Sequence, residues 1–80
     1  MTNRTQVPKE TVIREFPPMG KYRVRVLENE KNHQRVLDIR EFISSESFEG
    51  FTRRGIRLAD RAQLDLLRDV LKEILESMLI

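Results

Sequence analysis

Apolar and basic residues alternate strictly along residues 21–26, Lys-Tyr-Arg-Val-Arg-Val. Successive side chains of a strand point to opposite faces of a sheet, so the pattern predicts a strand over residues 21–27 that directs Tyr22, Val24 and Val26 into a core. Its basic residues then form one outward row, which consists of Lys21, Arg23 and Arg25. Residues of such a row recur about every 7 Å, close to the spacing of phosphates on an extended single nucleic-acid strand. A polyanion is therefore the first partner to consider, and a solvated sheet face is the alternative.

Three other segments have the composition of strands. Residues 35–43 alternate again, and a further strand over residues 51–58 is interrupted by Gly55. A short edge strand is expected to end at Pro17-Pro18, because proline has no amide to donate to a ladder. The predicted strands are residues 12–16, 21–27, 35–43 and 51–58, with polar loops over residues 28–34 and 44–50.

A helix is predicted over residues 60–79. Asp60 followed by Gln63 matches a capping box, and the segment contains neither proline nor glycine. Its apolar residues recur at helical spacing and cover about half the circumference, which is wider than one sheet can bury. These residues, here called the apolar stripe, are Leu64, Leu67, Val70, Leu71, Ile74, Leu75 and Met78. A homodimer is therefore expected, held by Leu67, Leu71, Ile74, Leu75 and Met78; a core closed by loops is the alternative.

Composition narrows the function further. The 80 residues contain no cysteine and one histidine, so the chain has no disulfide, no thiolate metal site and no histidine cluster. We find no pair of nucleophile and base and no glycine-rich phosphate loop, so no catalytic residue, cofactor or small-molecule substrate is expected. We expect a mobile arm over residues 1–11 and one domain over residues 12–80, with neither a signal peptide nor a membrane span, in a soluble intracellular protein.

Charge is distributed unevenly along the chain, although the net charge is only +2. Residues 21–58 carry nine basic and six acidic side chains, whereas residues 59–80 carry three basic and five acidic ones. The positive excess thus lies in the predicted sheet and the negative excess in the predicted helix. This asymmetry favours a sheet that meets an anion and a helix that does not.

Three blocks of the sequence resemble the transcriptional coactivator family of positive cofactor four. They are residues 20–26 (Gly-Lys-Tyr-Arg-Val-Arg-Val), 36–42 (Val-Leu-Asp-Ile-Arg-Glu-Phe) and 53–58 (Arg-Arg-Gly-Ile-Arg-Leu), and the resemblance covers about residues 16–78. It implies an α+β fold, a curved four-stranded antiparallel sheet followed by one helix (ββββα), which forms a homodimer through the helices. It also implies binding of single-stranded or unwound DNA along the sheets, with little sequence preference.

Several positions carry the family's binding pattern. Arg40 matches the family's DNA-contacting arginine, and Arg53 and Arg54 match its basic pair. The row of Lys21, Arg23 and Arg25 matches the basic first strand of the family. Ile43, however, stands where eukaryotic members place a stacking tryptophan, and the loop over residues 28–34 lacks their aromatic residue. The rings left for stacking are Tyr22, Phe42, Phe48 and Phe51, and core packing is the alternative for each. The predicted nucleic-acid-binding residues are Lys21, Arg23, Arg25, Arg40, Phe42, Arg53, Arg54 and Arg57.

Together these patterns predict a non-enzymatic, dimeric protein that binds single-stranded DNA with little regard to sequence. The resemblance implies a role in transcription, as coactivator or regulator, or in replication, with partners in the transcription or replication machinery. It implies a nuclear location if the source is eukaryotic, and the cytoplasm or nucleoid if the source is a bacterium or a phage. Two alternatives stay open. Single-stranded RNA offers the same phosphates and bases, and an acidic protein partner would suit a dimeric adaptor with a basic face.

Overall fold

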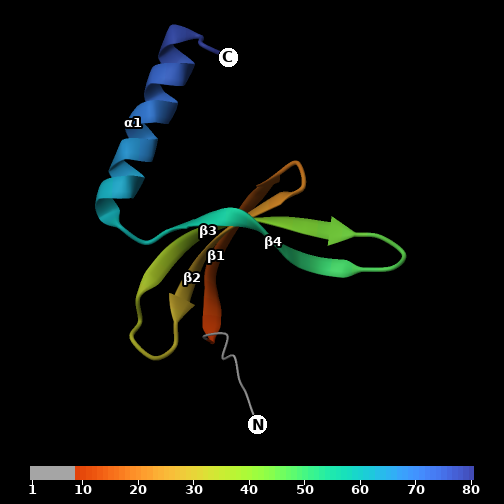
Figure 1. The fold of residues 1–80 in the computed structure, drawn as a ribbon. Coiled ribbons are helices and arrows are strands. Elements are labelled where there is room, and N and C mark those ends of the chain that lie inside the picture. Colours follow the sequence, from red (N-terminus) through yellow and green to blue (C-terminus); the bar gives the residue numbers. More distant parts are fainter. Residues whose placement is uncertain (1–8) are drawn as a thin grey trace.

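The computed structural model describes residues 9–80 as one antiparallel sheet followed by one helix (Figure 1). The strands are neighbours in chain order, so the sheet is a simple meander. The elements are β1 (Glu10–Met19), β2 (Tyr22–Asn29), β3 (Arg35–Ser44), β4 (Glu49–Leu58) and α1 (Arg61–Ser77). The predicted ββββα order and α+β class are thus confirmed.

β1 is longer than the sequence predicted. It begins at Glu10 and continues through Pro17-Pro18 to Met19, so the prediction that the prolines end the strand is wrong. Because β1 is an edge strand and pairs only with β2, a residue without an amide costs little there. The register shifts between Phe16 and Met19, where the two prolines lie. Of the predicted arm over residues 1–11, residues 1–8 lie outside the described part, and residues 10 and 11 belong to β1.

The turn before β2 also differs from the prediction. Lys21 lies in this turn with Gly20, and the strand begins at Tyr22. Gly20 has a φ of 60°, a left-handed conformation that glycine adopts without steric cost. At its other end β2 extends to Asn29, whose side-chain oxygen accepts hydrogen bonds from the amides of the following turn. The loop between β2 and β3 is therefore shorter than predicted.

The register of the sheet separates its side chains into two faces. Arg23 lies opposite Arg40, and Asp38 lies opposite both Arg25 and Arg57. We call this side the arginine face; it also contains Phe42 and Phe51, which are paired across β3 and β4. The other side, the apolar face, contains Tyr22, Val24, Val26, Leu37, Ile39, Ile56 and Leu58.

Burial is greatest on the arginine face. Among residues 9–80, the buried aliphatic side chains are Leu27 and Val36, which are partners in register and belong to that face. Tyr22, Val24 and Val26, predicted to point into a core, are only half-buried, and Ile56 is 52% exposed. The alternating residues predicted to enter a core are therefore covered only in part within one chain. The sheet is strongly twisted (Figure 1), and its outer strands approach each other over the arginine face instead.

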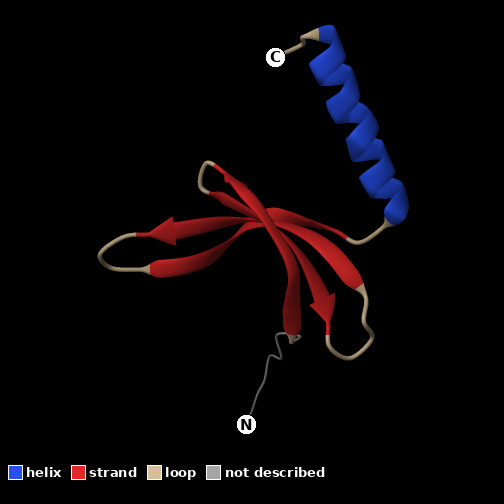
Figure 2. Cartoon of the chain, turned by 180° about the vertical axis from the view of Figure 1, so that it is seen from behind, coloured by secondary structure: helices blue, strands red, loops and turns tan. Residues whose placement is uncertain are grey.

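The helix stands apart from the sheet (Figure 2). Asp60 is its N-cap and accepts a hydrogen bond from the amide of Ala62 (2.9 Å), while Met78 ends it in a left-handed conformation. None of its residues is buried, and Leu71 and Leu75 are 49% and 77% exposed. Most of the apolar stripe is thus exposed within one chain, while Leu64, Leu67 and Ile74 are half-buried. Among the described residues no helix is long and apolar enough to cross a membrane.

Candidate nucleic-acid interface

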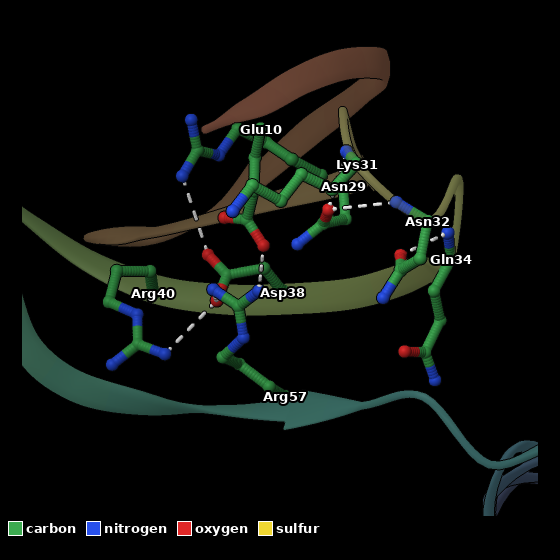
Figure 3. A network of polar contacts seen from close by, with 9 residues as sticks. Glu10, Asn29, Lys31, Asn32, Gln34, Asp38, Arg40 and Arg57 are labelled. Carbon is green, nitrogen blue, oxygen red and sulfur yellow. Dashed lines mark hydrogen bonds and ion pairs between the residues drawn. The ribbon is translucent and has the colours of Figure 1, made fainter. Parts of the chain in front are cut away.

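Asp38 is the centre of the arginine face. Its side chain is 1% exposed, and one oxygen lies 3.0 Å from Nη2 of Arg40 and 3.6 Å from Nη1 of Arg57 (Figure 3). The other oxygen lies 3.4 Å from Nη2 of Arg25. A buried carboxylate is costly unless cations and hydrogen bonds compensate it, and three guanidinium groups do so here. Asp38 therefore fixes three of the arginines that the sequence predicted as contacts to nucleic acid.

Two further carboxylates come from the edge strand β1. Glu10 pairs with Arg57 of β4, so this contact joins the two outer strands of the sheet. Glu15 lies 3.7 Å from Nη1 of Arg23 and is itself half exposed. With Asp38, three carboxylates thus accompany the four arginines of this face. The basic row that the alternation predicted is thus paired with carboxylates at Arg23 and Arg25.

Two arginines of β2 lie over phenylalanine rings. Cζ of Arg23 is 4.1 Å from the ring centroid of Phe42, and Cζ of Arg25 is 4.0 Å from that of Phe51. The two rings contact each other edge to face, with centroids 5.0 Å apart and planes inclined by 77°. Phe51 is 39% exposed. The arginine face therefore combines positive charge with aromatic surface.

Arg40 is held between two strands. Besides Asp38 it contacts β4, because its Nη1 donates a hydrogen bond of 2.6 Å to the carbonyl oxygen of Arg53. Gly55 is its partner in register. A Cβ at Gly55 would stand 2.2 Å from the carbonyl oxygen of Ile39, so only glycine lets β4 come this close. The sequence predicted that Arg40 contacts nucleic acid directly. In the structure, Arg40 also lies where it can position β4 relative to β3.

Lys21 belongs to a separate cluster. Its Nζ lies 2.9 Å from a carboxylate oxygen of Glu41, which is buried and also accepts a 2.7 Å hydrogen bond from the hydroxyl of Thr52. The hydrogen bonds from Lys21 and Thr52 hold the pKa of Glu41 below its ordinary value. In return, Glu41 raises the pKa of Lys21, and the nearby charge of Arg54 opposes this rise. The prediction that Lys21 continues the row of Arg23 and Arg25 is wrong, because Lys21 lies in the turn.

Arg53 and Arg54 are the least engaged of the predicted basic residues. Both are exposed and lie in β4 where its register with β3 shifts, between Phe51 and Gly55. Within the described residues neither guanidinium takes part in an ion pair. They supply positive charge close to Arg40, whose Nη1 contacts the backbone of Arg53.

The structure brings most of the predicted site together. Arg23, Arg25, Arg40, Phe42 and Arg57 share one face, while Arg53 and Arg54 lie beside it on β4 and Lys21 lies in the turn. Sequence reasoning named Phe51 only as one of four possible stacking rings and did not include Asp38 or Glu10 among the site residues. Alternation placed Asp38 on the same side as Arg40, but the contact of Glu10 with Arg57 joins residues 47 positions apart and left no local signal.

The described residues contain no group of three or more histidine, cysteine, aspartate or glutamate side chains that could hold a metal ion. His33 lies in the loop after β2, and its Nδ1 is 3.3 Å from Glu28.

No protein-family model, no curated protein and no solved structure matches this chain. The resemblance to positive cofactor four therefore stays a prediction from the sequence, and the case for a function rests on the chain's own geometry.

Proposed function

We propose that this chain is a non-enzymatic protein that binds single-stranded DNA along its arginine face. The observation that carries the proposal is the position of Arg23 and Arg25 over Phe42 and Phe51, next to Arg40 and Arg57. Proteins that bind single strands combine a basic surface that follows the phosphates with planar groups on which bases stack. A role in transcription or replication follows from the sequence resemblance alone.

Paired carboxylates shape how such a site works. Asp38 is buried and stays with its arginines, so it orients their guanidinium groups. Glu15 is half exposed, and Arg57, the partner of Glu10, is 43% exposed, so phosphates compete with these acids at the surface. Arg53 and Arg54, which form no ion pair within residues 9–80, add charge at the side. The proposed site therefore has a smaller net positive charge than a row of basic residues without carboxylate partners, and its guanidinium groups are held in a more ordered arrangement.

We propose further that the binding unit is a homodimer. The apolar face of the sheet is only half-buried and most of the apolar stripe of α1 is exposed in one chain, and the helix contributes no buried residue. The apolar face also has a shallow depression lined by Met19, Tyr22, Ile39, Gly55 and Ile56. Surfaces of this kind are stable in water only when another surface covers them. A second copy supplies two such surfaces at once and leaves both arginine faces open.

The proposal is tested by fluorescence anisotropy with labelled DNA at two salt concentrations. A single strand should bind more tightly than a duplex of the same sequence, because a duplex hides its base faces and resists bending. The affinity should fall steeply with salt, by an amount that depends on the number of phosphates neutralised. Equal affinity for both forms would leave only a generic basic patch, and tight binding of an acidic peptide instead would favour an adaptor. A strand of RNA in the same assay separates the two nucleic acids.

A further inference from the structure

The two arginine–phenylalanine pairs of the arginine face hold their guanidinium groups in fixed positions. Arg23 lies over Phe42 at 4.1 Å and Arg25 over Phe51 at 4.0 Å. A guanidinium group is planar and stacks on aromatic faces, so each ring supports one side of a flat cation. The edge-to-face contact between the two rings, at 5.0 Å, restrains both supports at once.

The pairs differ in how much surface they leave open. The side chain of Arg23 is 38% exposed, so a planar group of a ligand can reach part of it. The side chain of Arg25 is only 17% exposed, and its buried Nε has no hydrogen-bond partner in the described residues. Arg23 is therefore the more accessible of the two arginines. Arg25 is more buried, and its Nε is the donor without a partner among residues 9–80.

We propose that Arg23, supported by Phe42, is a base-stacking platform of the single-strand site. This inference rests on the proposed function and specifies its chemistry: a base lies on the guanidinium plane of Arg23, while the ring of Phe42 serves as the layer beneath. The more buried Arg25, over Phe51, remains paired with Asp38. Sequence reasoning had assigned Arg23 to phosphates alone.

Stacking on an arginine depends on the base, whereas attraction to a phosphate does not. Replacing Arg23 with lysine keeps the positive charge but removes the plane. Loss of one stacked base typically weakens binding by about fivefold to a hundredfold. The two contributions can therefore be separated with a strand that keeps its phosphates but lacks its bases.

The experiment compares a labelled oligothymidine with a strand of equal length in which the central nucleotides are abasic. The unaltered protein should bind the complete strand at least about tenfold more tightly. Arg23→Lys should reduce this ratio to about threefold or less, while its affinity for the abasic strand stays nearly unchanged. Phe42→Leu, which keeps all charges and removes the supporting ring, should reduce the ratio as well. The matched control is Arg35→Lys, because Arg35 pairs with Glu28 (2.8 Å) and lies over no ring that the structure describes.

The outcomes separate this inference from the proposed function. If the unaltered protein binds both strands equally well, or if Arg23→Lys keeps the ratio of the unaltered protein, stacking on Arg23 is overturned and the proposed single-strand binding stands. If neither strand binds, the proposed function fails and the inference fails with it.

Discussion

Asp38 shows how one residue sets the properties of a whole face. It is 1% exposed and contacts three guanidinium groups. Its negative charge therefore stabilises their positions and offsets part of the positive charge of the face. Removing one partner of a buried ionic cluster leaves the others uncompensated. Stability and nucleic-acid affinity should therefore respond to Asp38 in opposite directions.

The first prediction concerns Asp38→Asn, which keeps the shape of the side chain and removes its charge. The free energy of unfolding should fall by about 2 kcal/mol, because three arginines lose their common anion. Affinity for single strands should rise, with a steeper salt dependence, because the face gains positive charge. Denaturant unfolding and anisotropy measure the two effects. Asp69→Asn, at an exposed carboxylate of α1, is the control; an unchanged affinity in Asp38→Asn would mean that its arginines do not meet the strand.

The second prediction concerns Arg40, which contacts Asp38 and the carbonyl oxygen of Arg53 through different nitrogens. A lysine ammonium cannot match this planar two-sided geometry, so Arg40→Lys should destabilise the fold by about 1 to 2 kcal/mol. Arg40→Ala should in addition flatten the salt dependence of binding by about one unit if Arg40 meets a phosphate. An unfolding midpoint in Arg40→Lys equal to that of the parent protein would contradict the positioning role.

The third prediction concerns pH and Glu41. The pKa of Glu41 is lowered in the fold from its ordinary value of 4.5 by its hydrogen bonds to Lys21 and Thr52. Because its pKa is lowered in the fold, the ionised carboxylate of Glu41 contributes its full stabilisation above pH 4.5. This contribution to the free energy of unfolding is lost as the pH falls below that value. Glu41→Gln should therefore make stability less dependent on pH as the pH falls below 4.5, and Glu46→Gln, in an exposed loop, is the control for loss of a surface carboxylate. Parallel stability curves for all three proteins would refute this role of Glu41.

Among the elements, β4 depends most on a single glycine. Gly55 lies where a Cβ would meet the backbone of β3 at 2.2 Å, directly opposite Arg40. A collision with backbone atoms is relieved only if the strands separate. The position of Arg40 and the path of β4 are therefore coupled.

The fourth prediction follows from this collision. Gly55→Ala should lower the free energy of unfolding by about 3 kcal/mol. Gly20→Ala is the matched control, since a Cβ there meets nothing within 4 Å and its φ of 60° costs only about 1 kcal/mol. Both values come from denaturant unfolding. Equal losses in the two variants would show that strand approach at Gly55 does not matter.

The elements themselves were largely predictable from the sequence, because alternation and helical spacing are local signals. The order of four strands and one helix was predicted correctly, and Asp60 is the N-cap. The ends of the strands were not, since an edge strand tolerates Pro17-Pro18 and Gly20 moves Lys21 into a turn. Alternation also predicted two faces of the sheet, but it did not indicate over which face the outer strands approach each other. The contact of Glu10 with Arg57 depends on the twist of the entire sheet, which no short segment specifies.

At the scale of the whole molecule, one chain leaves too much apolar surface uncovered. Leu66, Leu71 and Leu75 of α1 are 64%, 49% and 77% exposed, and the apolar face of the sheet is only half-buried. For a chain of 80 residues this is a large share of the surface available for a core. Stability and assembly should therefore be inseparable.

The fifth prediction is that the protein sediments as a dimer at micromolar concentration. Leu75→Glu places a charge in the apolar stripe and should yield monomers or unfolded chains, because a charge buried without a partner is costly. Lys72→Glu, outside the apolar stripe on the same helix, should leave the dimer intact. A well-folded monomer of the unaltered protein would contradict the proposed assembly.

The central claim, that single strands lie along the arginine face, is tested most directly by following arginine side chains in solution. Nitrogen-15 NMR spectra of the Nε–H groups can be recorded while oligothymidine is added. The signals of Arg23, Arg25 and Arg57 should shift together and saturate, while those of Arg61 and Arg68 on α1 should not move. Shifts confined to the helix, or spread equally over all arginines, would contradict the account.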